Sequence, residues 1–437
     1  MRRLAGTPYR GDMRRRTTLA RVFAVAGAVL LVGCSTTPSS PPASAGQTIG
    51  PGQTGEPSGG AIEPPIETAP ATTTPTLPVS SGPWQPAAEQ DSVAGSQLLD
   101  VAWTGTQFVA AGFGLGGSGT FLRSSDGRAW KSGTSGGTSG APEHIAAAPS
   151  GIVAVGTLDD KTASWFSADG VHWDYHLKVF PKSLGASDMV QVTDVVSNGT
   201  GWIAVGRDDE ACNVSCEPAP LRALVWRSTD GLDWTRLTGQ AALRGGGINA
   251  IAAVGGGFVA GGDRDGRAAF WWSPDGVTWT RAADDPSFGP SNAGDIVRVV
   301  GVAAREGAIV AVGMQQGKGG DSAPTVMAWR SSDGQTWAPA SVERGTEGQV
   351  FSVAATTTGF LATGPSGDTS CLGGIWSSTD GSAWTCEATD AAFEGFGPYA
   401  AAGAPSVEIA VGLTSFGCGE DACPNGFPGA IWWRPIP

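Results

Sequence analysis

The chain has 437 residues, ample for a large core, and a formal net charge of −13. This acidic balance excludes nucleic acid as the partner, because phosphates require a basic stripe on the protein. Glycine is abundant, with 67 residues, and no stretch keeps the 3.6-residue hydrophobic period of a helix. The composition therefore indicates short strands joined by many turns.

Residues 1–33 have the three parts of an export signal. Seven arginines precede the apolar run "VFAVAGAVLLV" at 22–32, which is too short to span a bilayer as a helix. The run ends in "LVGCS", which resembles the lipobox of bacterial lipoproteins. The resemblance implies that Cys34 becomes an acylated N-terminus and anchors the exported chain to the outer face of the bacterial membrane or envelope. The alternative is an ordinary signal peptide that happens to contain a cysteine.

Residues 34–82 are largely Ser, Thr, Pro, Gly and Ala. Such a segment cannot bury enough apolar surface to offset the entropy of ordering, so we expect a disordered stalk. As a flexible coil it would reach roughly 40 Å. Removal of residues 1–33 takes away seven arginines and one acid and leaves a net charge of about −19. That charge suits a solvated extracellular module, or one that binds cations or basic partners.

One motif recurs six times in residues 83–437. It reads Ser-x-Asp-Gly with a tryptophan four residues after the aspartate, as in "STDGLDW". Upstream of each copy lies a small-apolar strand that ends in glycine, such as "IVAVG", and a second short apolar strand precedes that one. Four short strands in each repeat of about 40–60 residues are typical of a propeller blade. The repeat aspartates are Asp126, Asp169, Asp230, Asp275, Asp333 and Asp380.

The repeat predicts an all-β fold, a seven-bladed β-propeller of four-stranded blades. The seventh repeat, from about residue 395, ends at "AIWWRPIP" and lacks a fourth strand. The segment "GPWQPAAE" at 82–89 is similar to "QTWAPASV" at 335–342, which is a fourth strand in its own repeat. We therefore expect the N-terminal strand (82–89) to join the C-terminal blade beside residues 430–434 and close the ring.

The Ser-x-Asp-Gly stretch is predicted to form the turn between the third and fourth strands of each blade. Glycine supplies a positive φ, the carboxylate accepts turn N–H groups, and serine bonds locally. Five copies also have a tryptophan four residues before the aspartate, and the first has Leu122 there. The flanking tryptophans are then placed to pack between neighbouring blades. The motif thus predicts a structural clamp rather than a catalytic group.

These repeats resemble the Asp-box (BNR) repeats of sialidase-like propellers across essentially all of 83–437. The usual Asp-box places glycine two residues after the aspartate and the aromatic residue five after, whereas here the spacings are one and four. The resemblance implies structural turns that lie away from any active site. Enzymes of that family use an arginine cluster, an acidic general acid/base and a tyrosine paired with a glutamate. Tyr399, Glu394 and Arg298 are of those types and fall on or near predicted inner strands, but no catalytic residue is carried over.

Three consecutive innermost strands carry Asp100, His144 and Asp194 at equivalent positions. One interpretation is a proton-transfer or metal site. The other, which we favour, is a buried polar network that ties blades together, with the imidazole hydrogen-bonded by at least one carboxylate.

Six cysteines follow Cys34, and an even number in an exported chain indicates disulfides. Fifteen pairings are possible, and proximity in sequence favours the local one. The spacings are unlike those of a zinc site, and we expect no cofactor or metal. The predicted pairs are Cys212–Cys216, Cys371–Cys386 and Cys418–Cys423. We expect the middle pair to face across the hairpin whose turn is "STDGS", with the two cysteines nearly opposite each other.

The connections between the second and third strands differ in length and chemistry, so we expect recognition on their face of the ring. Clusters of acids in them favour a basic or cation-bridged partner, although they also suit loops kept soluble by charge. The candidate binding residues are Asp159, Asp160, Asp208, Asp209, Glu210, Glu420 and Asp421.

The sequence as a whole predicts a monomeric, envelope-anchored lipoprotein whose propeller binds an extracellular ligand, such as a glycan or a basic protein, without chemistry of its own. The alternative is a sialidase-like, glycan-active hydrolase. An enzyme would need convergent arginines and paired acids in a concave site at the centre of the ring.

Overall fold

The computed structural model describes 82–87, 96–114, 118–135, 140–158, 161–177, 179–180, 190–208, 222–317, 323–387, 393, 395–414 and 429–437. The predicted export signal, Cys34 and nearly all of the predicted stalk lie outside these residues. The described part contains strands, two single 3₁₀ turns at Ala241–Leu243 and Pro286–Phe288, and no α-helix. None of its segments could cross a membrane as a helix.

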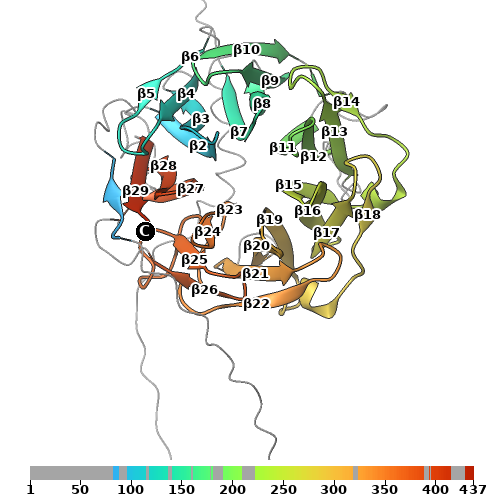
Figure 1. The fold of residues 1–437 in the computed structure, drawn as a ribbon. Coiled ribbons are helices and arrows are strands. Elements are labelled where there is room, and N and C mark those ends of the chain that lie inside the picture. The colour runs from blue at the N-terminus through green and yellow to red at the C-terminus, as the bar shows by residue number, and fades with distance from the viewer. Residues whose placement is uncertain are drawn as a thin grey trace, which may run out of the picture.

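The strands form sheets arranged around a central axis, as in a β-propeller (Figure 1). Four sheets run from an inner to an outer strand in sequence order, with β6 added to the second. They consist of β2 (Ser96–Trp103), β3 (Phe108–Gly114), β4 (Gly119–Ser124) and β5 (Lys131–Ser132); of β7 (Ala141–Ala148), β8 (Gly151–Leu158), β9 (Lys161–Ser167), β10 (His172–Leu177) and β6 (Thr134–Ser135); of β11 (Val190–Ser197), β12 (Trp202–Asp208), β13 (Arg222–Ser228) and β14 (Thr235–Arg236); and of β15 (Gly247–Val254), β16 (Gly257–Arg264), β17 (Arg267–Ser273) and β18 (Thr280–Arg281).

Two further sheets complete the ring. One has eight strands, in two four-stranded halves joined by parallel pairing of their outer strands. Its halves are β19 (Asp295–Arg305), β20 (Ala308–Gly317), β21 (Thr325–Ser331) and β22 (Ala338–Val342), and β23 (Ser352–Ala355), β24 (Phe360–Thr363), β25 (Ile375–Ser378) and β26 (Ala383–Cys386). The last sheet holds β27 (Gly397–Ala404), β28 (Val407–Leu413), β29 (Gly429–Pro435) and β1 (Gln85–Pro86).

The N-terminal strand closes the last sheet, as the sequence predicts. β1 runs antiparallel to β29, with Gln85 opposite Trp433 and Pro86 opposite Trp432. The pairing extends on both sides, because Gly82 N–H donates to the Pro435 carbonyl (3.0 Å) and Ala87 N–H donates to the Ile431 carbonyl (2.9 Å). The observed strand is shorter than the predicted 82–89, of which 88–89 lie outside the described residues.

The six Ser-x-Asp-Gly turns have the predicted geometry. In the first, Ser124 Oγ accepts the Gly127 N–H (2.9 Å), and Asp126 Oδ1 accepts the N–H groups of Arg128 (2.9 Å) and Ala129 (3.1 Å). The serine–glycine bond and a carboxylate–amide bond recur in every copy. All six glycines have φ between 70° and 84°.

Each turn packs against the neighbouring sheet. A Cβ at Gly231 would lie 2.3 Å from Val153 Cγ2, and one at Gly381 would lie 2.2 Å from Val310 Cγ1. The tryptophans fill the same junctions: Trp226 and Trp234 share one core cluster with Val153 of the preceding sheet. The clamp interpretation of the motif is therefore confirmed.

The sequence predicts a glycine at the end of each second strand, but strands such as β3 and β8 continue two residues beyond it. This glycine is required by an irregularity in the inner strand. Six inner strands contain a β-bulge at this level, for example between Leu98 and Asp100 of β2. The bulge brings an inner-strand carbonyl against the second strand, so that a Cβ at Gly112 would lie 1.8 Å from the Gln97 oxygen. The same clash, at 1.8–2.2 Å, would occur at Gly112, Gly156, Gly206, Gly262, Gly313, Gly364 and Gly412.

The ring has two chemically different faces. The turn face carries the Ser-x-Asp-Gly turns and the short turns between first and second strands, such as Ala404–Val407. The loop face carries the connections between second and third strands, which follow Asp208, Arg264 and Leu413. The turn face is nearly uniform, and the loop face is not.

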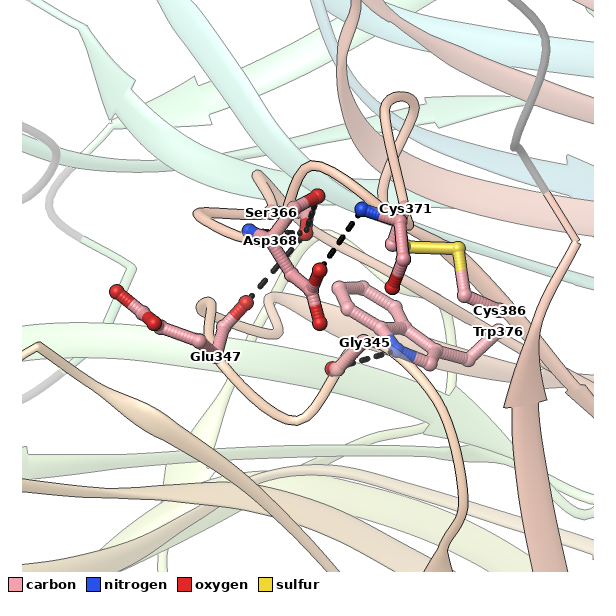
Figure 2. The surroundings of a disulfide bond; sticks show 8 residues. Gly345, Glu347, Ser366, Asp368, Cys371, Trp376 and Cys386 are labelled. Carbon is pink, nitrogen blue, oxygen red and sulfur yellow. Dashed lines mark hydrogen bonds between the residues drawn. A yellow bond between two sulfur atoms is a disulfide. The ribbon is translucent and has the colours of Figure 1, made fainter.

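A disulfide joins Cys371 and Cys386, as predicted (Figure 2). The two cysteines do not face each other across a hairpin, however, since the residue opposite Cys386 is Trp376. Cys371 lies in the connection before β25, and its N–H donates to the Asp368 carbonyl (2.9 Å). The disulfide therefore ties this connection to β26, the outer strand of its half-sheet. Beside it, Trp376 Nε1 donates to the carbonyl of Gly345 (3.0 Å). The other four cysteines lie outside the described residues.

We expect Gly112→Ala to destabilise the fold by about 3 kcal/mol or more, because its Cβ would overlap the Gln97 carbonyl and neither backbone can move freely. Gly367→Ala is the matched control, since its Cβ would meet only ordinary contacts at 3.5 Å and beyond. Urea denaturation measures both changes. Equal stabilities of the two variants would contradict the role given to the bulge.

Removal of the disulfide by Cys371→Ser with Cys386→Ser should lower the free energy of unfolding by about 3 kcal/mol, the value for a loop of 15 residues. Denaturant titration with and without a reductant measures the loss. If the disulfide is the cause, the reductant should lower the free energy of unfolding of the wild-type protein by a similar amount. The double variant should not show this loss when the reductant is added.

Candidate functional site

The residue that each bulge adds to an inner strand is half-buried, on strands that surround the centre of the ring (Figure 1). These positions differ in chemistry from sheet to sheet, whereas the residues just before them are buried and mostly aliphatic. They are Leu99, Glu143, Thr193, Asn249, Val300 and Tyr399, and Phe351 holds the same position before β23.

A polar cluster lies beside this ring of residues on the loop face, and we call it the mouth cluster. It contains Gln191, Arg207, Asn249, Asp263 and Arg298. Arg207 donates through Nε to Gln191 Oε1 (3.1 Å) and through Nη1 to Asn249 Oδ1 (3.4 Å). Asn249 in turn donates to the Val299 carbonyl (2.8 Å), which fixes its amide. Neighbouring sheets thus hold Arg207 in place.

The mouth cluster has more positive than negative charge. Arg207 Nη1 lies 4.0 Å from Asp263 Oδ1. Arg298 is close enough for both groups to affect it: burial lowers the pKa of Arg298, Asp263 opposes the effect, and Arg207 adds to it. Within the described part of the chain, Arg298 forms no hydrogen bond or ion pair. Within the mouth cluster, the half-buried Arg298 thus lies near a second guanidinium group and near the carboxylate of Asp263.

An aromatic pair lies on the neighbouring inner strands. The rings of Phe351 and Tyr399 stack with centroids 5.1 Å apart and planes 19° apart. Burial raises the pKa of Tyr399 to about 12, so the phenol stays neutral. Both side chains are half-buried, and β19, which carries Arg298, contacts β23. The loop face thus combines a cationic group and an apolar platform near the axis.

The predicted Asp–His–Asp network requires correction. Asp100 Oδ2 accepts the N–H of Ile145 (2.8 Å), and Asp194 Oδ2 accepts the N–H of Ile251 (2.8 Å). Each of these aspartates also accepts the N–H of the residue that follows it. Among the described residues, His144 has no hydrogen bond to either carboxylate. The aspartates do tie sheets together, but they do so through backbone amides of the next inner strand.

Burial shifts the pKa of these groups toward their neutral forms. It raises the pKa of Asp100 to about 7 and that of Asp194 to about 8, although the backbone N–H groups oppose the rise. It raises the pKa of Glu143, which accepts the Thr157 hydroxyl (3.1 Å), to about 7 and lowers that of His144 to about 4. The inner strands therefore carry little negative charge below neutral pH.

Most of the predicted acidic binding residues lie outside the described residues: Asp159, Asp160, Asp209, Glu210, Glu420 and Asp421. The backbone of Asp208 ends β12 on the loop face, opposite Val190. Glu394 also lies outside. The described ranges contain no group of three or more His, Cys, Asp or Glu residues arranged to hold a metal ion.

The mouth cluster is not predicted as a unit from the repeat. Asp100, His144 and Asp194 occupy one equivalent position of the inner strands, whereas Asn249 occupies the bulged position that precedes it. A comparison of that preceding position between repeats is the signal that could have found Asn249.

No protein-family model matches this chain, and no curated protein matches it. Solved structures of similar fold include YCF48 bound to D1 peptide, with 12% identity, a TM-score of 0.48 and coverage of 84% of this chain and 100% of that chain. An α-L-arabinanase of Penicillium chrysogenum complexed with arabinobiose has 11% identity, a TM-score of 0.45 and coverage of 78% and 96%. Trypanosoma rangeli sialidase has 15% identity, a TM-score of 0.41 and coverage of 70% of this chain and 56% of that chain. At these identities the similarity concerns the fold alone.

Stability should fall as pH rises from about 4 to 8. In this interval the folded chain keeps protons on Asp100, Glu143 and Asp194 that the unfolded chain releases, so ionisation favours unfolding. The double variant Asp100→Asn with Asp194→Asn should flatten the dependence of melting temperature on pH between 5 and 9.

The turn variant Asp333→Asn is the control for this measurement. The Thr336 N–H, which donates to Asp333, lowers the pKa of that carboxyl, so the stability that this group contributes is lost only below about pH 4. Its melting temperature should be lower than that of the wild type by about the same amount at every pH above 5. The slope of melting temperature against pH should therefore stay that of the wild type. A wild-type slope in the double variant would show that the inner aspartates are ionised in the folded chain.

Proposed function

We propose that this protein is a binding protein of the cell envelope whose propeller recognises a ligand on the loop face without transforming it. The proposal takes the eight-stranded sheet as two blades of a seven-bladed ring, and it includes export, acylation of Cys34 and a stalk over 34–82. The repeat and the closure by β1 support a ring of seven blades. The export signal and the "LVGCS" sequence support the proposed anchor.

The observation that carries the binding role is the guanidinium of Arg298, which has no hydrogen-bond or ion-pair partner among the described residues. A half-buried charge without a partner costs stability, and folded proteins normally pair such groups. Arg207 adds to the positive potential at Arg298, and the carboxylate of Asp263 opposes it. A ligand with an anionic group, next to a ring or apolar portion that contacts Phe351 and Tyr399, complements this site.

The acidic residues predicted in the loops favour a different ligand, a basic or cation-bridged protein. That partner would contact the periphery of the loop face, around Asp208, rather than the mouth cluster. The two proposals differ in the sign of the ligand's charge, so the same binding experiment separates them. Binding that survives substitution of Arg298 and is lost on charge reversal at Asp208, Asp209, Glu420 and Asp421 would favour the basic partner.

A glycan-active hydrolase remains the second candidate, on one observation. Glu143 is a half-buried carboxyl whose pKa is raised to about 7, as a general acid requires. Its described partner is the Thr157 hydroxyl, and a hydrolase would need a second acid placed across the scissile bond. Release of sugar from any glycan that is abolished in Glu143→Gln would support this candidate over simple binding.

We expect the mature protein to bind carboxylated or sulfated glycans on an array and to lose that binding at least tenfold in Arg298→Gln, because a charge-assisted contact is removed. The melting temperature should stay equal or rise, since the variant no longer buries an unpaired charge. This combination separates a binding role from a structural one.

Arg227→Gln is the matched control, because Arg227 is an exposed arginine on β13. It should keep both binding and stability. Loss of stability in Arg298→Gln, or binding of neutral glycans alone, would count against recognition through the mouth cluster.

A further inference from the structure

The directions of the last strands fix where the described chain begins relative to the mouth cluster. β28 leaves the turn face at Val407 and reaches the loop face at Leu413. β29 pairs antiparallel with it, so Gly429 lies on the loop face and Pro435 on the turn face.

The pairing of β1 with β29 gives the direction of the N-terminal segment. It is antiparallel to β29, and Gly82 is bonded to Pro435 while Ala87 is bonded to Ile431. The chain therefore enters the ring on the turn face and runs toward the loop face. The C-terminal end lies on the turn face as well, because Ile436 N–H donates to the Ser406 carbonyl (3.0 Å).

This point of entry is firmly held. A Cβ at Gly82 would lie 2.7 Å from Pro435 Cγ, so the two backbones are in close contact. The ring of Trp84 lies 4.7 Å from the Arg434 guanidinium. Arg434, which is buried, donates to Glu408 Oε2 (2.7 Å) and also pairs with Glu387. The described chain is thus attached to the ring at its turn face, through Gly82 and Trp84.

The mouth cluster lies at the other end of the same strands. Arg207 and Asp263 are next to the last residues of β12 and β16, and Arg298 is near the start of β19. Each of these positions belongs to the loop face. The tether and the candidate binding site are therefore on opposite faces of the ring.

We propose that the anchored protein holds its turn face toward its own membrane and its loop face outward, so that its ligand comes from the medium or from an opposing surface. This inference rests on the proposed anchoring through Cys34. One physical argument favours the orientation: a tether drawn from the turn face would have to pass around the ring to point the loop face at the membrane. The acidic net charge also keeps the domain as a whole away from anionic lipid. A lipid headgroup of the anchoring membrane is accordingly the wrong ligand.

The test uses two insertion sites in one sheet. The turn at Gly255–Gly256 joins β15 to β16 on the turn face, and the turn at Asp265–Gly266 joins β16 to β17 on the loop face. A short labelling tag is inserted at either turn in the full-length protein, which is purified in acylated form and reconstituted into phosphatidylethanolamine–phosphatidylglycerol vesicles containing an acceptor-labelled lipid. An unchanged melting temperature establishes that each tagged protein is folded.

Energy transfer to the lipid should be more efficient from the tag at 255–256 than from the tag at 265–266. Equal transfer, or more transfer from 265–266, by protein that floats with the vesicles would overturn the orientation and leave the anchor intact. The Cys34→Ser variant should neither float nor transfer energy. If it floats as well as the unsubstituted protein, the proposed anchor is wrong, and the orientation is overturned with it.

Discussion

The extra residue in six of the inner strands is the constraint on which the centre of this ring depends. A regular strand would alternate its side chains between two packed surfaces, and both would be occupied by neighbouring sheets. The bulge instead adds a further half-buried residue to the strand, as at Glu143, Asn249 and Tyr399. It also presses a carbonyl against the second strand, which excludes any residue but glycine there. The apolar strands ending in glycine are therefore part of how the site is made.

The ring closes with different chemistry at the place where the chain has its ends. Six junctions use a turn that inserts its glycine against the second strand of the neighbouring sheet. The sheet of β27, β28, β29 and β1 has no such turn, because its third and fourth strands come from opposite ends of the sequence. Its junction has a buried ion pair instead, in which Arg434 is shared by Glu408 and Glu387. Buried pairs are tolerable when both partners are fully bonded, and Thr358 and Ser377 supply further bonds to these carboxylates.

The sequence was informative where one residue type has one physical use. Glycine after aspartate required a positive φ, tryptophans four residues on either side required burial, and an unfinished last repeat required a strand from elsewhere; all three predictions are confirmed. The failures concern features that the repeat does not specify. His144 was expected to bond to carboxylates at the same height, but the bulge directs Asp100 to a backbone amide. Likewise, the disulfide pairing was right and its hairpin placement wrong, because loop paths carry no periodic signal.

The mouth cluster illustrates why a functional site is harder to predict than the repeat that carries it. Arg207, Asn249 and Arg298 belong to three sheets and are separated by long stretches of sequence, so no local pattern joins them. What joins them is the equivalence of positions between repeats, and that equivalence becomes exact only when each bulge is counted. The turn face repeats because it performs one structural task at each junction. The loop face is free of that task, and a half-buried arginine can persist there because the clamps at the opposite end already hold the ring together.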